Sequence, residues 1–534
     1  MTASMTRPLL PADKVPAGAV FLRCLVGAAG LHLLLALSAC NTINDPHATT
    51  VSGSELFRQT YGDIAQYYID PVTPQALALA GLRKLSSLDP TFAVEISAGE
   101  VILRGKSGEH RFPAPPSHDA EAWGALTNAS LDAGRQLSPA LAGLADDRLR
   151  ETVIEGSLTI LDRFSHYASP SAALERRAAR DGFGGIGVSL DALEDAARII
   201  EVIPNTPAAM AGLRPHDRIA AVDGVPTNAL PHDELVRRLR GPAESEVELA
   251  IDRPGAERPI MVWVRRAFIV PPTVTLAEKS GVALLRISAF NQRTAQDLGD
   301  LLGQAHQDMG KGLHGIILDL RGNPGGLLDQ SVEVASLFLD GARVASTVGR
   351  VNESVQSFVA PHRQVERLPM AVLVNGGSAS AAEIVAAALQ DGGRAVVVGS
   401  ASYGKGTVQN VKPLPDEGEL TVTWARLIAP AGYSLHEHGV VPTLCTANLP
   451  DDAAGVAAAL ANGSPTLHQA RAELDEAKWH RLRDACPGQR EDHDIDIAVA
   501  ERVLAEPMLY SRALRLMPTA GAARAVPAAA RPRF

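Results

Sequence analysis

The chain has 534 residues, which is enough for about three domains that each bury a hydrophobic core. It carries 50 Lys and Arg residues against 60 Asp and Glu residues, so its formal net charge is -10. This acidic balance excludes the electrostatic footprint of a nucleic-acid-binding protein and does not favour a polyanionic ligand.

The N-terminal segment has the layout of a secretory signal. Basic residues precede an apolar run over residues 24–39, which is shorter than the ~20 residues of a membrane-spanning helix. The run ends in a Leu-Ser-Ala-Cys segment that resembles the lipobox of bacterial lipoproteins, so Cys40 is the expected lipidation site. We expect residues 1–39 to be a lipoprotein signal peptide and residues 40–54 a tether. The protein would then be anchored by lipid on the periplasmic side of a bacterial cell envelope; the alternatives are an uncleaved anchor or a chance cysteine.

Residues 55–180 are expected to form a helical domain with a small β insertion. Apolar residues recur at helical spacing over residues 55–88 and again over 120–180. Between them, apolar and polar residues alternate over residues 92–110, which predicts a hairpin after Pro90. The sequence assigns no role to this insertion.

The composition changes between residues 181 and 268, where Gly-rich turns separate short apolar runs. Five strands are expected here, with helices over residues 208–212 and 232–239 between them. This order predicts a compact β-sandwich.

Strands and helices alternate over residues 269–449, as in a layered α/β core. The expected strands cover residues 282–287, 315–320, 370–375 and 395–399, and the expected helices cover 294–306, 330–338 and 381–390. Residues 450–534 are expected to form Ala-rich helices and, from Ala520 onward, a disordered tail.

Two cysteines, Cys445 and Cys486, lie beyond the leader and its expected lipid site. In an oxidising compartment they could pair, but a sequence does not reveal whether their geometry permits it. Both the paired and the free state stay open at this point.

Ser380 is the candidate nucleophile. It follows an apolar strand and a Gly-Gly turn and opens the expected helix, where helix N–H groups and the helix dipole favour an oxyanion. The structural alternative is specific, because Ser380 and Glu383 form a capping-box pattern and most such serines only cap a helix.

Lys405 is the candidate base. A serine needs a group that takes its proton, and a desolvated lysine amine can do this in place of histidine. Lys405 lies in a Gly-rich turn after an apolar strand, and burial must lower its pKa from ~10.4 for the amine to be neutral. Gln409, four residues on, could orient the amine. A solvated loop lysine and an exposed strand glutamine are the alternatives.

A third segment, residues 319–326, places a Gly-rich turn after a strand, as an oxyanion hole requires, although most such turns are only turns. The His-Glu-His sequence at residues 436–438 has no third ligand at a suggestive spacing. We therefore expect a polar loop there, no metal site and no cofactor.

Together these segments resemble the C-terminal processing peptidases, or tail-specific proteases, which are ATP-independent Ser/Lys serine proteases. Residues 377–383 resemble the family's nucleophile segment and residues 403–409 its lysine segment, with the family's spacing of 25 between Ser380 and Lys405. The resemblance implies that Gln409 positions Lys405. It also implies that the backbone N–H groups of Gly326 and Ala381 form the oxyanion hole.

The same family carries a PDZ domain ahead of its protease core. Residues 207–213 and 217–224 resemble the characteristic PDZ run, and residues 184–187 resemble its carboxylate-binding loop. The loop amides would hold a terminal carboxylate while the substrate tail adds to the sheet as a strand. A Gly-rich hairpin without a ligand is the alternative. The four loop residues are Gly184, Gly185, Ile186 and Gly187.

The expected fold is therefore a multidomain α/β protein, with a helical N-terminal region, a PDZ domain and a layered core of the crotonase and Clp-protease kind. The expected function is endoproteolysis of exported proteins near their C-termini. The expected partners are polypeptide tails and, through the lipid, a membrane; an adaptor protein and a homo-oligomer stay open. Two other classes remain as alternatives, a catalytically silent PDZ scaffold and an enzyme for small acyl substrates on a related core.

Overall fold

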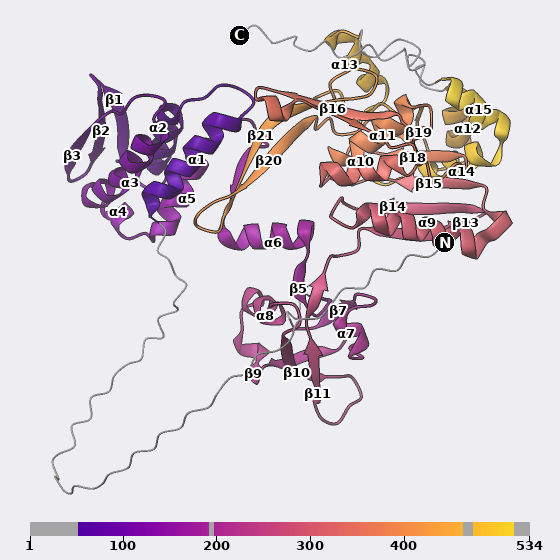
Figure 1. Ribbon diagram of the computed structural model, residues 1–534, viewed down its shortest axis with the longest axis horizontal. Coiled ribbons are helices and arrows are strands. Elements are labelled where there is room, and N and C mark those ends of the chain that lie inside the picture. The colour runs from indigo at the N-terminus through magenta and orange to yellow at the C-terminus, as the bar shows by residue number, and fades with distance from the viewer. Residues whose placement is uncertain (1–51, 192–196, 463–473, 517–534) are drawn as a thin grey trace, which may run out of the picture. The chain divides into compact units, whose positions relative to one another are not determined.

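The computed structural model describes residues 52–191, 197–462 and 474–516 (Figure 1). The predicted signal peptide, the predicted lipidation site Cys40 and the predicted tail from Ala520 lie outside these ranges. Within the three ranges, no helix combines the length and the apolar character that crossing a membrane requires.

The first region is a group of helices around a shared core. Its helices are α1 (Gly53–Tyr67), α2 (Pro74–Lys84), η1 (Leu85–Ser87), α3 (Ala120–Leu137), α4 (Pro139–Ala142), α5 (Asp146–Leu158) and α6 (Pro170–Asp181). Helices α1 and α3 pack along each other and bury Phe57, Tyr61 and Trp123 completely. Gly124 permits this approach, because a Cβ atom there would lie 2.6 Å from the backbone nitrogen of Arg58.

The insertion after Pro90 is a three-stranded antiparallel sheet and not the predicted hairpin. Its strands are β1 (Ala93–Ser97), β2 (Glu100–Gly105) and β3 (Gly108–Pro113). The third strand escaped prediction because its first four residues are all exposed and polar or glycine, so no apolar alternation marks it. The other two strands contribute Val94, Val101 and Leu103 to the helical core.

All five strands and both helices predicted between residues 181 and 268 are present. The elements are β5 (Phe183–Gly185), β6 (Val188–Leu190), β7 (Ile199–Val202), α7 (Pro207–Met210), β8 (Arg218–Val222), β9 (Val225–Pro226), η2 (Thr227–Ala229), α8 (His232–Leu239), β10 (Glu246–Asp252), β11 (Ile260–Arg265) and β12 (Ala267–Ile269). The largest sheet has the order β11-β10-β8-β9, while β12 pairs with β5 and β6 with β7. Ile199, Leu235 and Leu249 lie in a core that belongs to this region alone.

A six-stranded sheet forms the centre of the remaining chain. Its order is β13 (Val274–Lys279), β14 (Val282–Ile287), β15 (Gly315–Asp319), β18 (Met370–Val374), β19 (Val396–Gly399) and β22 (Leu444–Cys445). Only β13 is antiparallel to its neighbour. The parallel strands read as unbroken apolar runs in the sequence because both faces of this sheet are buried.

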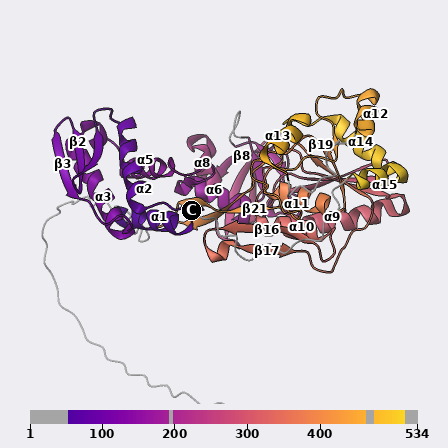
Figure 2. The same ribbon diagram turned by 90° about the horizontal axis from the view of Figure 1, so that it is seen from above.

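Helices from different parts of the chain cover the two faces (Figures 1 and 2). One face packs against α9 (Thr294–Met309), α10 (Leu328–Ser336) and α11 (Ala381–Asp391). The other face packs against α12 (Ala453–Asn462), α14 (Asp494–Ala505) and α15 (Pro507–Arg515). The helices beyond residue 449 therefore complete the hydrophobic core of the sheet. A short turn, η3 (Gly310–Gly312), follows α9.

A second, smaller sheet lies next to the first. Its order is β17 (Gln356–Val359), β16 (Arg343–Gly349), β21 (Glu419–Ile428) and β20 (Thr407–Pro413), with η4 (Asn352–Ser354) between β16 and β17. Strand β4 (His166–Ala168), from the helical region, also pairs with β21. The sequence did not predict β16, β17 or β4.

A disulfide joins Cys445 to Cys486. Cys445 ends the edge strand β22, and Cys486 directly follows α13 (Glu476–Ala485). Of the two states that the sequence left open, the structure has the paired one, and this bond ties α13 to the edge of the central sheet.

Candidate active site

Ser380 immediately precedes α11 in an unusual backbone conformation. Its φ is 54° and its ψ is -115°, a region that non-glycine residues occupy only at an energetic cost. The side chain is half-buried. The Glu383 carboxylate accepts the Ser380 N–H at 2.8 Å, so that half of the capping box is present. A strained serine at a strand-to-helix turn is the geometry of an exposed nucleophile, and here it coexists with the cap.

The carboxylate of Glu383 joins the serine turn to the lysine turn. Its Oε2 atom accepts the N–H of Ser380 at 2.8 Å and the N–H of Lys405 at 2.9 Å, so those nitrogens lie no farther apart than the two lengths combined. Its Oε1 atom accepts the N–H of Gly404 at 2.7 Å and the hydroxyl of Ser402. Glu383 is completely buried. Burial raises the pKa of Glu383, and the four donors oppose that rise.

Lys405 has the environment of a base. Burial lowers the pKa of its amine, while the charges of Glu383 and Asp162 act in the opposite direction. The Nζ atom lies 5.4 Å from the centre of the Phe164 ring. Within the described ranges, no carboxylate forms a salt bridge with Nζ, so the charges of Glu383 and Asp162 favour the charged amine only from beyond ion-pair distance.

Gln409 lies on β20, directly after the lysine turn. Its amide nitrogen donates to the hydroxyls of Thr407 at 2.8 Å and Thr423 at 3.2 Å. These two bonds fix the amide so that its oxygen is left as an acceptor. The geometry is compatible with a role in orienting the Lys405 ammonium, and that role stays a prediction.

The turn after β15 lies against Ser380. A Cβ atom added at Gly325 would lie 2.8 Å from the Ser380 Cβ, and one added at Gly326 would lie 2.0 Å from the carbonyl oxygen of Phe290. The N–H groups of Gly326 and Ala381 donate to no other group in the part of the chain that the structure describes. Both predicted oxyanion donors are therefore free to bind a ligand.

Replacement of Gly326 by alanine tests this donor. The φ of 146° and the contact with Phe290 leave no room for a side chain, so the backbone must shift and its N–H must move. We expect kcat for peptide cleavage to fall by about 10²- to 10³-fold. Gly393→Ala is the matched control, because Gly393 also has positive φ but its Cβ would meet nothing within 4 Å. Equal losses in the two variants would contradict the assignment.

Sequence reasoning missed two groups at this site. Glu383 was interpreted only as the partner in a helix cap, and its link to the lysine turn depends on a contact across 22 residues. Phe164 lies far from Lys405 in the sequence, within residues 161–167, which resemble the segment that precedes the PDZ domain in the family. That resemblance did not indicate that its ring lies beside the lysine amine.

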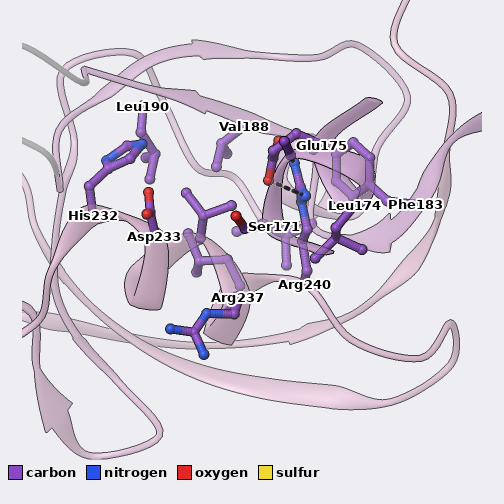
Figure 3. A pocket seen from close by; sticks show the side chains of 15 residues that line it. Ser171, Leu174, Glu175, Phe183, Val188, Leu190, His232, Asp233, Arg237 and Arg240 are labelled. Atoms are coloured by element: carbon purple, nitrogen blue, oxygen red, sulfur yellow. Dashed lines mark hydrogen bonds and ion pairs between the residues drawn. The ribbon is translucent and has the colours of Figure 1, made fainter. Parts of the chain in front are cut away.

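A second candidate site is a cavity of about 600 Å³ in the β-rich region (Figure 3). Strand β6 and helix α8 line it, with α6 contributing Leu174 and Glu175. The walls are largely apolar, through Ile186, Val188, Leu190, Val236 and Leu239. The guanidinium of Arg240 donates to both oxygens of Glu175, at 2.7 and 2.9 Å, and lies over the ring of Phe183.

The structure brings only two of the four predicted loop residues to this cavity. Ile186 and Gly187 line it, and their N–H groups donate to no other described residue. Gly184 and Gly185 pair instead with β12, and the carbonyl of Gly184 accepts the N–H of Gly241. Glycine is required at 187, where φ is 88° and a Cβ would lie 2.4 Å from Thr206.

In the loop that contains His436 and His438, both ring nitrogens of His438 are hydrogen-bonded to neighbouring residues. His438 bonds the carbonyl of Ser434 at 2.8 Å and the carboxylate of Glu476 at 3.0 Å, and its ring stacks on Trp479. Across residues 52–191, 197–462 and 474–516, no three His, Cys, Asp or Glu side chains are arranged to hold a metal ion.

Comparison with known proteins gives two family matches. A model of peptidase family S41 matches residues 281–445, and a PDZ domain model matches residues 176–252. The carboxy-terminal-processing protease of Bartonella bacilliformis is 37% identical over 305 residues, which are 56% of this chain and 70% of the relative. The carboxyl-terminal-processing protease of Synechocystis sp. is 35% identical over 300 residues, 54% and 69% of the two chains.

Two solved structures are also similar. The photosystem II D1 C-terminal processing protease is 24% identical, and the match covers 76% of this chain and 96% of that one with a TM-score of 0.38. The PDZ domain of a carboxy-terminal protease from Vibrio cholerae, solved in complex with a peptide, is 28% identical. That match covers 16% and 97% of the two chains with a TM-score of 0.15.

Proposed function

The chain belongs to the carboxy-terminal-processing proteases of peptidase family S41, and we propose that it cleaves exported proteins near their C-termini with Ser380 and Lys405. It is a serine-type peptidase in which a PDZ domain precedes an α/β core, as the sequence predicts. The observation that carries the proposal is the Glu383 carboxylate, which holds the Ser380 and Lys405 turns side by side. Hydrolysis itself needs only water as co-substrate. That the protein also works without ATP is part of the proposal and follows from its resemblance to the tail-specific proteases.

In the proposed reaction, the neutral amine of Lys405 takes the proton of the Ser380 hydroxyl while Oγ bonds to the peptide carbonyl carbon. The N–H groups of Gly326 and Ala381 stabilise the oxyanion. The Lys405 ammonium then protonates the leaving amine as the C–N bond breaks, which leaves an acyl-enzyme. Lys405 next takes a proton from water, the resulting hydroxide attacks the ester, and Ser380 leaves with the proton.

The PDZ cavity supplies recruitment in this proposal. The free N–H groups of Ile186 and Gly187 suit a terminal carboxylate, and the apolar walls formed by Val188, Leu190 and Val236 suit an apolar last residue. A tail added beside β6 would place the preceding residues along α6 and α8. Polypeptide tails are thus the proposed partners of this site.

The test compares two unfolded proteins that differ only at their last residues, one apolar and one acidic, with cleavage followed by mass spectrometry. We expect the full-length protein to cleave the first much faster. The variant Val236→Asp places a carboxylate in the cavity and should remove that preference, whereas Arg238→Asp, on the same helix but outside the cavity, should retain it. Tail binding without cleavage would instead indicate a scaffold.

The proposed base predicts a pH profile. Only the neutral amine of Lys405 can accept a proton, so kcat/KM should rise with pH and level off above the pKa of that amine. Because burial lowers this pKa, the midpoint should lie below the ordinary value of 10.5. Initial rates from pH 5 to 10 measure the profile. A rate that is constant across the whole range would contradict a lysine base.

We also propose that the protein is held at a membrane by lipid on Cys40, on the periplasmic side of the envelope. The support is the lipobox-like segment that ends at this cysteine. In cell fractions, Cys40→Ser should move the protein from the membrane pellet to the soluble fraction, and mass spectrometry of the N-terminal peptide should lose the acyl mass. An unchanged distribution would contradict lipid anchoring.

A further inference from the structure

A short segment near the C-terminus packs against the turns that carry the reacting groups. We call residues 487–493 the C-terminal strap; it lies outside residues 281–445, which the peptidase family model matches. The Gln489 carbonyl accepts the N–H of Gly376 at 2.5 Å, and its N–H donates to the hydroxyl of Ser400 at 3.0 Å. The approach at Gly376 is tight, because a Cβ there would lie 3.0 Å from the Gln489 carbonyl oxygen.

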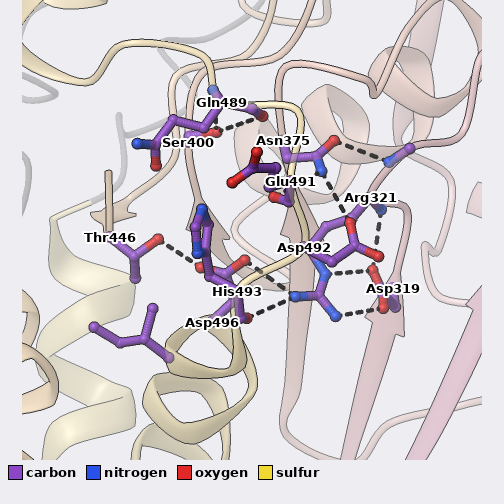
Figure 4. A network of polar contacts seen from close by, with 12 residues as sticks. Asp319, Arg321, Asn375, Ser400, Thr446, Gln489, Glu491, Asp492, His493 and Asp496 are labelled. Atoms are coloured by element: carbon purple, nitrogen blue, oxygen red, sulfur yellow. Dashed lines mark hydrogen bonds and ion pairs between the residues drawn. The ribbon is translucent and has the colours of Figure 1, made fainter. Parts of the chain in front are cut away.

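Asn375 is the residue that connects the strap to the reacting turns (Figure 4). Its side-chain oxygen accepts the N–H of Gly322 and the N–H of Gly377, both at 2.9 Å. Its amide nitrogen donates to the strap, at 3.1 Å to the carbonyl of Arg490 and at 3.0 Å to the carboxylate of Asp492. One amide therefore links three segments: the turn after β15 that contains Gly322 and Gly326, the turn before α11 that contains Gly377 and Ser380, and the strap.

The two turns that Asn375 bridges are also hydrogen-bonded directly to each other. The N–H of Ala379 donates to the carbonyl of Asn323 at 2.9 Å, and the hydroxyl of Ser378 donates to the carbonyl of Leu320 at 2.8 Å. The contact is close, since a Cβ added at Gly377 would lie 3.0 Å from the Cα of Gly322. A shift of one turn must therefore move the other, and with it the position of Gly326 relative to Ser380.

Both ends of the strap are anchored to the central sheet. The Cys445–Cys486 disulfide holds the residue just before it. At the other end, the buried guanidinium of Arg321 donates to the carbonyl of His493 at 2.8 Å, to Asp496 at 3.2 Å and to Asp319 at 2.8 Å (Figure 4). The strap is thus a fixed support, and Asn375 transmits its position to the site.

We propose that Asn375, held by the C-terminal strap, is a positioning residue for peptide cleavage that sets the oxyanion donors of Gly326 and Ala381 relative to Ser380. This inference rests on the proposed function. Within the described residues, the side-chain hydrogen bonds of Asn375 go to backbone groups and to Asp492, and none goes to Ser380 or Lys405, so it acts through the backbone of the two turns. Because a misplacement of about 1 Å at a reacting centre costs about 10²-fold in rate, small changes at Asn375 should be measurable.

The test measures kcat, KM and tail affinity in variants of the full-length protein. Asn375→Ala should lower kcat by about 10²-fold and weaken a peptide boronate, which forms a tetrahedral adduct with the serine, by a similar factor. Tail affinity at the PDZ cavity should not change. Asn375→Asp keeps the acceptor for Gly322 and Gly377 but replaces the donor to the strap with an oxygen that faces the Asp492 carboxylate, so its kcat should fall at least as far as that of Asn375→Ala.

Two further variants separate positioning from general loss of stability. Asp492→Ala removes a strap acceptor of Asn375 at a side chain that is 37% exposed and ion-paired with Arg286, and it should lower kcat about 3- to 10-fold in a fully folded protein. Gln390→Ala removes a completely buried amide near the far end of α11 and should lower the melting temperature without lowering kcat.

The outcomes distinguish this inference from the proposed function. A wild type that cleaves, together with Asn375→Ala and Asp492→Ala variants whose kcat is unchanged, would overturn the positioning role alone. A wild type that binds tails and never cleaves would overturn the proposed function. A loss of kcat in Gln390→Ala as large as in Asn375→Ala would also overturn the positioning role, since any buried amide would then suffice.

Discussion

Replacement of Ser380 by alanine is expected to lower kcat for peptide cleavage by about 10⁴-fold or more while tail binding is unchanged. The hydroxyl is the group of the Ser380 side chain that forms the acyl-enzyme. The hydrogen bond from the backbone N–H of Ser380 to Glu383 does not depend on this hydroxyl. The PDZ cavity lies in a separate core and should not respond. Ser357→Ala, at an exposed strand position, is the control.

Lys405→Ala should produce a similar loss, because a serine without its base stays protonated. The double variant Ser380→Ala/Lys405→Ala should have the same kcat as either single variant. The two residues act as a unit, so removing one already removes the contribution of both. Lys412→Ala is the matched control. It also removes a lysine that lies over an aromatic ring, that of Tyr67, but Lys412 is on strand β20 beyond the lysine turn. Residual cleavage of one tenth of wild type in Ser380→Ala would place the nucleophile elsewhere.

The alternation of apolar runs with amphipathic segments predicted most of the central sheet. Strands β14, β15, β18 and β19 lie within one or two residues of their predicted bounds, because parallel strands buried on both faces leave a strong local pattern. The same pattern contributed to the choice of Ser380 and Lys405, together with the resemblance of residues 377–383 and 403–409 to the family's segments, and their catalytic roles stay predictions. Each follows such a strand, and the carboxyl ends of parallel strands meet at one edge of the sheet.

Elements defined by partners distant in the sequence escaped prediction. Strand β21 ends at Ile428 and pairs with β20, which precedes it, and with β16 from far upstream. Pro430 and Gly432 end the strand, which is the expected effect of turn residues. The C-terminal strap gave no signal either, because many of its contacts are made by backbone groups that every residue carries and its Asp492 carboxylate belongs to no motif.

The same limit applies to Glu383. At the sequence level it is a helix cap, which the four residues from Ser380 to Glu383 suffice to define, whereas its four donors come from Ser380, Ser402, Gly404 and Lys405. The Ser402 hydroxyl is itself occupied on its other side, since it accepts the N–H of Val440 at 2.7 Å and so gives its proton to Glu383. Both oxygens of this carboxylate therefore accept two hydrogen bonds each.

Glu383→Ala is expected to destabilise the protein and to abolish cleavage. Both effects follow from loss of the carboxylate, but they have separate causes. Removing a buried carboxylate leaves four donors without a partner, and we expect the free energy of unfolding to fall by about 3–5 kcal/mol. Cleavage should fall with it even where the variant is fully folded, because nothing then ties the Ser380 turn to the Lys405 turn. Glu383→Gln keeps the volume but one acceptor atom becomes a donor, so it should lose roughly half as much stability.

Glu366 provides the matched control for this variant. It is also a buried carboxylate that accepts backbone N–H groups, from Arg367 at 2.6 Å and Leu368 at 2.7 Å, but it lies away from the serine and lysine turns. Glu366→Gln should lower stability and leave kcat at wild-type level when both are measured well below the melting temperature. Denaturant unfolding gives the first quantity and single-turnover cleavage the second. If the Glu383 and Glu366 variants lose kcat alike, the effect is one of stability; if only Glu383→Gln does, the carboxylate aligns the dyad.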